Sequence, residues 1–348
     1  MGQMQQDADE YFRVWNPEQA DPNHQEKPEE LEQRKAAQDA LSIQYYNLVT
    51  SIFQKSGRMC GHLCRLSPNE PMAQSLVRHE HYLAHRVNIQ EGEKILDVGC
   101  GIGNPARSIA RFTGANITGL NINAQQLRQA RQLTQEAGLG YQVNFVEQNF
   151  LHMDDFAAET FDGAYAIEST CYAPDLVEVY SEIFRVLKPG ARFGVYEALL
   201  TDKYDEANPV HREVKTNIER GGGLARIHTS AEAIAAMKAV GFEILAIDDL
   251  GARPDQIPWE TQLSDPTLEK QGWLSFALLS VFFAARASPL VNRGLQAVVG
   301  KLEQLTLFPA GSQKVVDLVV TILDGMYRGG ALGIFSPMFL IVARKPEA

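Results

Sequence analysis

Three glycines at alternating positions follow a short apolar stretch and precede a helical one. Gly99, Gly101 and Gly103 come after Asp97 in the pattern D-x-G-x-G-x-G, with Cys100 inside the turn. Glycine lets the backbone approach a ligand closely, and the first turn of the following helix offers free amide donors. A dinucleotide-type turn, G-x-G-x-x-G, would need a glycine where this chain has Asn104. The pattern therefore predicts a cofactor site of another kind.

Polar side chains also follow the next two predicted strands. Asn121 and Ile122 follow the strand 116–120, and Asn149 and Phe150 follow the strand 142–148. Asn121 can bond ribose hydroxyls as both donor and acceptor without adding charge, and Asn149 can face an adenine edge. Capping of the next helix is the open alternative for either asparagine.

An acid stands at the end of the predicted fourth strand, which runs from Phe161 to Ile167. Glu168 follows that strand, with Tyr165 before it and Tyr172 after it. Burial in an apolar cleft raises the pKa of a carboxyl, and the carboxylate can stabilise a cation there. We therefore expect Glu168 to face the reacting group of the cofactor. A salt bridge or a helix cap is the alternative.

A second acid and aromatic pair, Tyr196 and Glu197, ends the predicted fifth strand, and we expect it on the same rim as Glu168. His79 and Glu80 lie in a helical segment before the sheet. Both can fold over the cofactor, and an exposed helix face is the alternative. The catalytic candidates are thus Glu168, Tyr165, Tyr172, Glu197, Tyr196 and His79.

Strands and helices alternate through the middle of the chain, which predicts an α/β fold with a parallel sheet. The expected strands are 94–98, 116–120, 142–148, 161–167, 192–198, 242–248 and 338–343. The expected helices are 31–53, 72–85, 105–112, 124–137, 176–187 and 231–240. In such a sheet, ligands bind at the carboxyl ends of the strands.

Composition excludes several classes of protein. The 348 residues carry a net charge of −11, which argues against a nucleic-acid partner. Four cysteines without a paired framework, and a polar start without a signal peptide, indicate a cytoplasmic protein. Cys60, His62 and Cys64 lack an obvious fourth ligand, so no metal is expected.

Segments outside the sheet suggest a three-part organisation. We expect a loose arm up to about Pro28 within an N-terminal arm and helical cap over 1–75. A cofactor-binding domain would then span 76–250, and a substrate lobe with the last strand 251–348. The run Trp273–Ala285 is too short to span a bilayer. A core helix, a wall of a lipophilic pocket and contact with an internal membrane surface are its alternatives.

These motifs together resemble the sterol 24-C-methyltransferases, from about Tyr45 to the end of the chain. The matching segments are RHEHYLA (78–84), LDVGCGIGNPAR (96–107), GLNIN (119–123), YAIESTCYAPD (165–175), VYSEIFRVLKPG (179–190), VYEALLTDKYDEANPVHR (195–212) and FSPMFLIVARKP (335–346). The resemblance implies a class I fold that binds S-adenosyl-L-methionine (SAM), with a seven-stranded Rossmann-like sheet whose last two strands are antiparallel. It also implies an N-terminal helical cap, a C-terminal sterol-methyltransferase-type helical lobe and a lipophilic, isoprenoid-type substrate. Dimers or tetramers are consistent with it.

Family chemistry implies a role for the acid. An alkene attacks the sulfonium methyl, a carbocation forms, and a base removes a proton. This requires a dry, aromatic pocket with an acid that stabilises the cation. By resemblance, Glu168 is the leading candidate, with Tyr165, Tyr196 and Glu197 on the wall.

The sequence departs from the family where the sterol is held. The family pattern Y-E-Y-G-W-G-S-S-F-H-F corresponds here to FQKSGRMCGHL (53–63), which has lost most of its aromatic residues. Tyr172 stands in place of a histidine, and Asn149 and Gly222 in place of aspartates. These changes predict another lipophilic substrate, of terpenoid or polyketide type. C-methyl transfer is the leading hypothesis; a SAM-requiring Diels–Alder cyclase, with SAM as a charged non-reacting element, and a binding-only paralogue are the alternatives.

Overall fold

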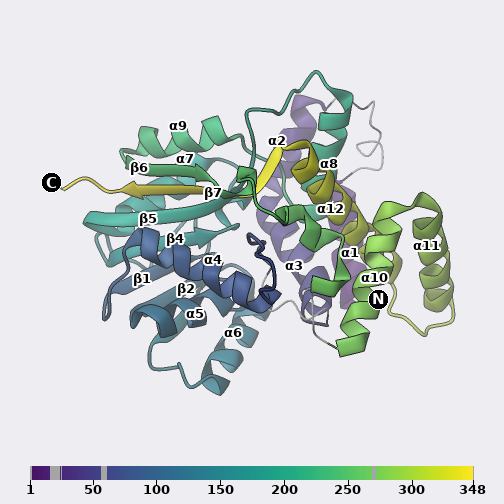
Figure 1. Ribbon diagram of the computed structural model, residues 1–348, viewed down its shortest axis with the longest axis horizontal. Coiled ribbons are helices and arrows are strands. Elements are labelled where there is room, and N and C mark those ends of the chain that lie inside the picture. Colours follow the sequence, from purple (N-terminus) through teal and green to yellow (C-terminus); the bar gives the residue numbers. More distant parts are fainter. Residues whose placement is uncertain (1, 16–23, 25, 56–60, 269–271, 348) are drawn as a thin grey trace. The chain divides into compact units, whose positions relative to one another are not determined.

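The computed structural model describes residues 2–15, 24, 26–55, 61–268 and 272–347, with the side chains of 51–55 and 272–275 excepted. Two compact units share the chain. Unit 1 comprises Met1–Arg58, Lys203–Ile227 and Glu260–Phe335, and unit 2 comprises Met59–Asp202, His228–Trp259 and Ser336–Ala348. Each unit is therefore assembled from separate stretches of sequence (Figure 1).

Unit 2 is built on a seven-stranded sheet in the order β3-β2-β1-β4-β5-β7-β6. The strands are β1 (Lys94–Val98), β2 (Asn116–Asn121), β3 (Val143–Glu147), β4 (Phe161–Ile167), β5 (Leu187–Leu200), β6 (Glu243–Asp249) and β7 (Phe335–Arg344). The pairs of β1 with β2 and β4, β2 with β3, and β4 with β5 are parallel, and β6 and β7 are antiparallel. The expected fold class, the seven strands and the antiparallel pairing of the last two are confirmed.

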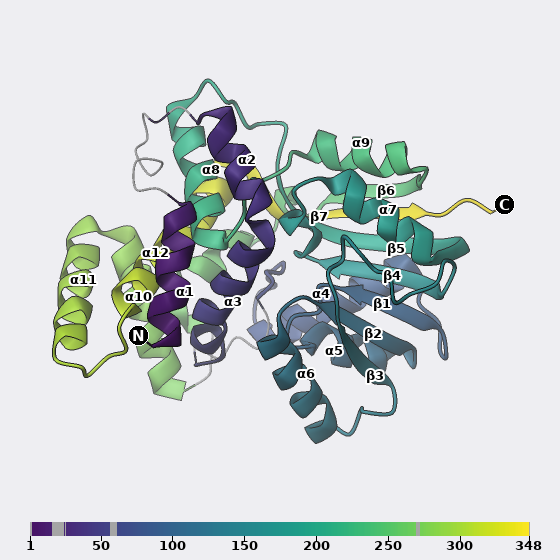
Figure 2. The ribbon, with the colours of Figure 1, turned by 180° about the vertical axis from the view of Figure 1, so that it is seen from behind.

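Helices cover both faces of this sheet (Figure 2). They are α4 (Met72–Val87), α5 (Asn104–Thr113), α6 (Ala124–Glu136), α7 (Leu176–Val186) and α9 (Ser230–Val240), with short 3₁₀ turns η2 (Thr170–Tyr172) and η3 (Leu250–Ala252). Alternate residues of β5 point to opposite sides: a Cβ on Gly194 would meet Val87 of α4, whereas Phe193 packs near Tyr180 of α7. The apolar character of β4 and β5 on both faces follows from this double cover.

Unit 1 is helical. Its helices are α1 (Gln3–Val14), α2 (Pro28–Ala36), α3 (Gln38–Lys55), α8 (Pro209–Gly222), α10 (Gly272–Ala287), α11 (Pro289–Gln304) and α12 (Ser312–Leu332), with 3₁₀ turns η4 (Trp259–Leu263) and η5 (Pro266–Leu268). Helices α8 and α12 approach closely, because a Cβ on Gly221 would lie 2.5 Å from the Ile322 nitrogen. At Gly222 a Cβ would lie 3.2 Å from the end of the Ile322 side chain. Small residues at these positions therefore allow the two helices to pack.

The predicted loose arm before Pro28 is wrong for residues 3–14, which form α1. Ala8, Tyr11 and Trp15 are buried at three- and four-residue spacing, and the Tyr11 hydroxyl donates a hydrogen bond to the Arg220 carbonyl of α8. The apolar stripe of α1 is narrow and lies among polar residues, so the polar composition of the segment did not indicate a packed helix. The single helix predicted over 31–53 is in fact α2 and α3, separated at Ala37.

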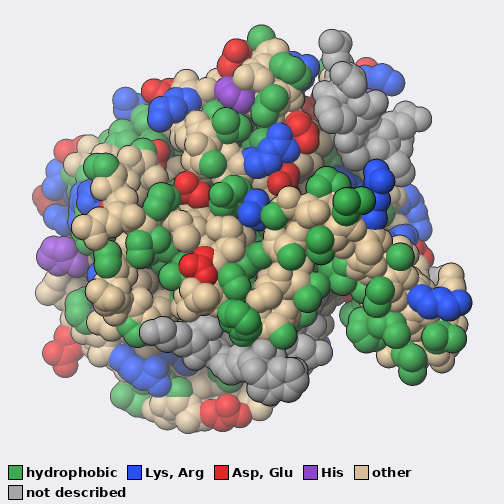
Figure 3. Space-filling model, turned by 45° about the vertical axis from the view of Figure 1, so that its right-hand side comes forward, with side chains coloured by type: hydrophobic (Ala, Val, Ile, Leu, Met, Phe, Trp, Pro, Cys, Tyr) green, Lys and Arg blue, Asp and Glu red, His purple; other side chains and the backbone are tan. Residues whose placement is uncertain are grey.

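The apolar run Trp273–Ala285 lies in α10, where Phe282 and Phe283 are buried. Its first three side chains lie outside the described residues. Within the described part of the chain, no helix has the length and apolar character needed to cross a bilayer. Side chains of both charge signs are interspersed over the face seen in the space-filling view (Figure 3).

Candidate functional site

The glycine turn between β1 and α5 has the geometry of a ligand cradle. Gly99, Gly101 and Gly103 have φ values of +80°, +54° and +75°, a region that favours glycine. A Cβ on Gly99 would lie 2.4 Å from Ser169 Cβ, and one on Gly103 would lie 2.5 Å from the Phe145 ring. A Cβ on Gly101 would meet nothing within 4 Å. Two glycines thus serve packing, and Gly101 leaves open space for a ligand.

Asp97, at the end of β1, is buried beside this turn. Its Oδ2 lacks a full hydrogen bond from the described residues, although the nearby Tyr165 side chain interacts with the carboxyl and opposes the rise of its pKa. Burial raises the pKa of Asp97 to about 7, and the nearby charge of Glu80 adds to the rise. A buried carboxylate is stabilised by a cationic partner. The open cradle at Gly101 and this carboxylate fit SAM, which carries an ammonium group and a sulfonium.

Asn121 braces the turn from the end of β2. Its Nδ2 donates to the Gly101 carbonyl at 3.3 Å and to Gln126 Oε1 at 2.9 Å. Asn123, rather than Asn121, caps α6 by accepting from the Gln126 nitrogen. Asn121 is therefore not the cap of α6, which was the alternative considered for it. Ile122, between the two asparagines, is half-buried.

The remaining cofactor candidates pack around the same strand ends. Asn149 Oδ1 accepts from the Leu151 nitrogen at 2.9 Å, which closes a local turn. Phe150 is partly buried against the sheet core. Cys100 is buried under β2, where a Cβ on Gly119 would lie 2.9 Å from its side chain. Contact of these three residues with SAM remains a prediction.

Glu168, directly after β4, has an unusual backbone. Its φ is +50°, a left-handed value that is rare for a residue with a side chain. Its amide donates to the Tyr196 carbonyl at 2.8 Å, and its Oε1 accepts from the Leu63 amide at 2.8 Å. The half-buried carboxyl has its pKa raised to about 8 by burial, and the charge of Glu197 adds to the rise. Backbone strain of this kind clusters at functional sites.

Tyr196 and Glu197 do not share a face of the sheet. Tyr196 stacks on His79 of α4, with ring centroids 3.9 Å apart, and its hydroxyl donates to the His79 carbonyl at 3.1 Å. Glu197 points to the other face, where Tyr180 donates to it at 2.8 Å and Thr170 also donates. Burial raises the pKa of Glu197 to about 7. Successive side chains of a strand face opposite sides of the sheet, so the prediction that Tyr196 and Glu197 lie together on one rim is wrong.

A buried histidine and glutamate pair was missed by the sequence analysis. His62 Nε2 lies 3.4 Å from Glu80 Oε1, and the rings of His62 and His79 are 5.9 Å apart. Burial raises the pKa of Glu80 to about 7 and lowers that of His79 well below its usual value. The sequence offered His62 only as a metal candidate. Across the described residues no group of metal ligands occurs, and Cys60 lies outside them.

The two tyrosines flanking Glu168 take different positions. Tyr165 is fully buried on β4, directly opposite Asp97 of β1 in the strand register. Tyr172 ends η2 and is half-buried, and its amide donates to the Ser169 carbonyl at 3.2 Å. Tyr165 therefore belongs to the cofactor end of the site. A role in chemistry for either residue remains a prediction.

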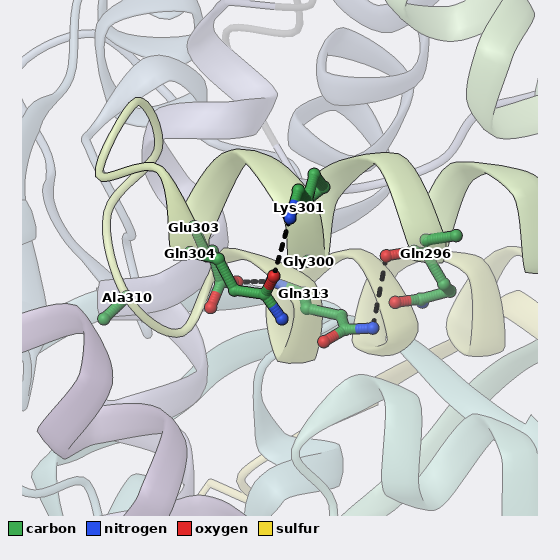
Figure 4. Close-up of a pocket in the computed structure, with 8 residues that line it drawn as sticks. Gln296, Gly300, Lys301, Glu303, Gln304, Ala310 and Gln313 are labelled. Carbon is green, nitrogen blue, oxygen red and sulfur yellow. Dashed lines mark hydrogen bonds between the residues drawn. The ribbon is translucent and has the colours of Figure 1, made fainter.

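A pocket of about 560 Å³ lies elsewhere, between α11 and α12 of unit 1 (Figure 4). Its lining is mixed, with alanines beside polar side chains: Gln313 Nε2 donates to the Gln296 carbonyl at 3.2 Å, and Lys301 donates to Gln304 at 3.4 Å. It contains none of the predicted site residues. We therefore place the candidate site at the strand ends of unit 2.

Comparisons with known proteins identify relatives of the whole chain. Residues 96–195 match the model of a methyltransferase domain, and residues 282–347 match that of a sterol methyltransferase C-terminal region. The chain is 84% identical to methyltransferase phqN of Penicillium fellutanum, over 100% of this chain and 99% of that one. It is 44% identical to sterol 24-C-methyltransferase ERG6A of Gibberella zeae, over 98% and 87%. Among solved structures, the [4+2]-cyclase SpnF is similar in fold, with a TM-score of 0.63 and 22% identity over 89% of this chain and 97% of that one.

Proposed function

Because this chain belongs to the SAM-dependent methyltransferase family that includes the sterol 24-C-methyltransferases, we propose that it methylates a carbon atom of a lipophilic secondary metabolite of terpenoid or polyketide type. The observation that carries the proposal is Glu168. This acid is fixed in a strained conformation at the carboxyl end of β4, beside the cofactor turn. Bound SAM supplies an electrophilic methyl group on a positively charged sulfur.

Residues of the turn hold the cofactor. The open space at Gly101 admits the ligand, Asp97 offers a buried carboxylate to its ammonium group, and Asn121 fixes the carbonyl of Gly101. Free amides in the first turn of α5 add donors for an anionic or hydroxyl group. These contacts orient SAM without taking part in bond making.

Glu168 acts on the substrate. When a carbon nucleophile gains a methyl group, positive charge develops on the substrate and a proton must leave. The Glu168 carboxylate stabilises that charge and then accepts the proton at Oε2, while the Leu63 amide holds Oε1. The pKa of Glu168 is about 8, so only part of the population is ionised near neutral pH. The positive charge of bound SAM would favour the ionised form, which a general base requires.

Support for a lipophilic substrate comes from the relatives. ERG6A and similar fungal proteins are named for methylation of a sterol. In the segment 53–63, which differs most from that family, the side chains up to position 60 lie outside the described part of the structure. With Tyr172 in place of the family histidine, it supports a substrate other than an ordinary sterol.

Sequence relatives favour methyl transfer over cyclisation. The similarity to the [4+2]-cyclase is one of fold, at 22% identity, whereas the relative at 84% identity is named a methyltransferase. The cyclase hypothesis keeps a clear experimental signature, because cyclisation leaves the mass of the substrate unchanged.

Incubation with methyl-deuterated SAM and a lipophilic extract of the producing cells tests the proposal. We expect a product that carries one labelled methyl, with one S-adenosylhomocysteine per product. The labelled methyl should resonate as a carbon-bound group by NMR. A heteroatom-bound methyl would contradict the carbon assignment, and a SAM-dependent product of unchanged mass would favour the cyclase.

A further inference from the structure

Exposed hydrophobic side chains are concentrated in one short part of unit 1. Among the described residues, sixteen large hydrophobic side chains are exposed, and eight of them lie between residues 276 and 308. Six form a group on α11 and the turn after it, which we call the α11 patch: Leu290, Val291, Val298, Leu305, Leu307 and Phe308. Leu290 and Leu307 are 78% and 68% exposed. Monomeric soluble proteins rarely leave so much apolar surface together.

Helix α11 is apolar over about half of its circumference, and unit 1 covers only one edge of that face. Val299 is buried in the core of unit 1 and Leu295 packs against it. At 100° per residue, Leu290, Leu305 and Val298 lie at about 0°, 60° and 80° around the helix, next to Leu295 and Val299 at about 140° and 180°. Since packing in unit 1 uses the edge with Leu295 and Val299, the edge with Leu290 is available for a partner.

Basic side chains outnumber acidic ones around the patch. Residues 272–316 contain four basic side chains and one acidic, whereas the whole chain has a net charge of −11. Lys314 is paired with Asp9 and Arg286 stacks on Tyr327, so Arg293 and Lys301 are the two cations that count here. The acid, Glu303, is occupied by the backbone amides of Gly311 and Gln313. Arg293 and Lys301 are exposed on α11. Figure 3 shows hydrophobic and basic side chains together at the lower right, where this region comes forward.

We infer that the α11 patch binds the surface of an anionic lipid bilayer. An apolar face flanked by Lys and Arg lies in the interface of a membrane, with the apolar side chains among the acyl chains and the cations at the headgroups. A second copy of this acidic chain would offer no matching negative charge in the patch itself, because that patch is also basic. The inference concerns binding alone and stands whether or not methyl transfer is to carbon.

Sedimentation of the full-length protein with vesicles tests this inference. We expect binding to phosphatidylcholine vesicles that contain about one third phosphatidylserine, and much weaker binding to phosphatidylcholine alone. A variant with Leu290→Asp, Leu307→Asp and Phe308→Asp should bind at least about a hundredfold more weakly. Leu290 is near the start of α11, where an acid suits the helix, and the other two positions lie in a turn, so the fold should persist.

Matched variants separate the contributions. Tyr141→Asp changes a residue in unit 2 that is 81% exposed, and vesicle binding should not change. Arg293→Gln with Lys301→Gln should weaken binding to anionic vesicles about twentyfold and leave binding to neutral vesicles unaltered. Circular dichroism and SAM affinity should stay constant in every variant.

Three results would overturn the inference. These are failure of the native chain to bind either vesicle, undiminished binding by the triple variant, and a solution dimer that the triple variant dissociates. The last result, seen by light scattering, would assign the patch to a second copy.

Discussion

The glycine turn of Asp97–Gly103 and the strand ends that carry Glu168 and Glu197 lie in one unit and depend on different physics. In the turn, function rests on the backbone: left-handed φ values and a missing side chain at Gly101 create space. At the strand ends, function rests on burial, which raises the pKa of Glu168 to about 8 and of Glu197 to about 7. The first region tolerates little change of shape, and the second little change of charge.

The two acids, Glu168 and Glu197, also differ from each other in their surroundings. Glu197 is fully buried and accepts hydrogen bonds from Tyr180 and Thr170, as a structural acid does. Glu168 is half-buried and has a strained backbone, and its side chain accepts a hydrogen bond from the Leu63 amide. Similar pKa shifts thus accompany different roles, and geometry distinguishes them.

The largest effect on SAM binding is expected when a side chain is added at Gly101, in the open space of the turn. Gly101→Val should weaken SAM binding by at least about a hundredfold, because the added atoms occupy the cradle. Isothermal titration calorimetry measures this directly. Gly138→Val is the matched control, since Gly138 has a φ of +69° and open space around it. Equal losses of SAM affinity in both variants would mean that backbone strain, and not the cradle, is responsible.

Affinity for SAM should also depend on pH through Asp97. Binding of a cation requires the ionised carboxylate, whose pKa burial raises to about 7. Between pH 7 and pH 5.5 the affinity should therefore fall by up to about tenfold per pH unit, with proton release on binding. The Asp97→Asn variant should bind weakly at every pH. A native affinity that is flat over this range would exclude Asp97 as the partner of the ammonium group.

A smaller effect is expected at the brace of the turn. Asn121→Ala removes the hydrogen bond to the Gly101 carbonyl, which should weaken SAM binding about three- to tenfold while leaving the fold intact. Gln126→Ala removes the other acceptor of the same side chain and serves as the control. If Gln126→Ala has the larger effect on SAM affinity, the brace acts through α6 instead of through the turn.

Stability should fall slightly as pH rises. The pKa values of Asp97, Glu80 and Glu197 are raised by burial to about 7, above the values of about 4 that these groups have when unfolded. Protonation therefore favours the folded state, and this stabilisation is fully present below about pH 4 and lost as pH rises through 7. The melting temperature of the SAM-free protein should drop by a few degrees between pH 6 and pH 8. Glu197→Gln should reduce that slope; an unchanged slope would show that Glu197 does not titrate here.

The turn could be predicted from sequence because its geometry is local. Asp97–Gly103 forms a strand, a turn and a helix start from adjacent residues, and the strands 94–98 and 161–167 have the predicted limits. The pairing of His62 with Glu80 and the bond from Leu63 to Glu168 join residues 18 and 105 positions apart, and no periodicity reports them. The helix α1 escaped prediction because its buried face is narrow.

The prediction for the end of β5 failed for a different reason. Tyr196 and Glu197 are neighbours in sequence, and a prediction that both line one rim ignored that successive side chains of a strand face opposite sides. The alternation rule could have been applied to the sequence. The pKa shifts could not be predicted from the sequence, since they depend on how completely the surrounding elements exclude water.

The most direct test of this account is the effect of Glu168→Gln on two quantities measured together, SAM affinity and methyl transfer to the substrate identified by labelling. Gln keeps the shape and can still accept from the Leu63 amide, but it cannot take a proton. We predict SAM affinity within about threefold of native and methyl transfer slower by about a hundredfold or more. Near-native methyl transfer, or loss of SAM affinity that explains the slower rate, would contradict the role of Glu168.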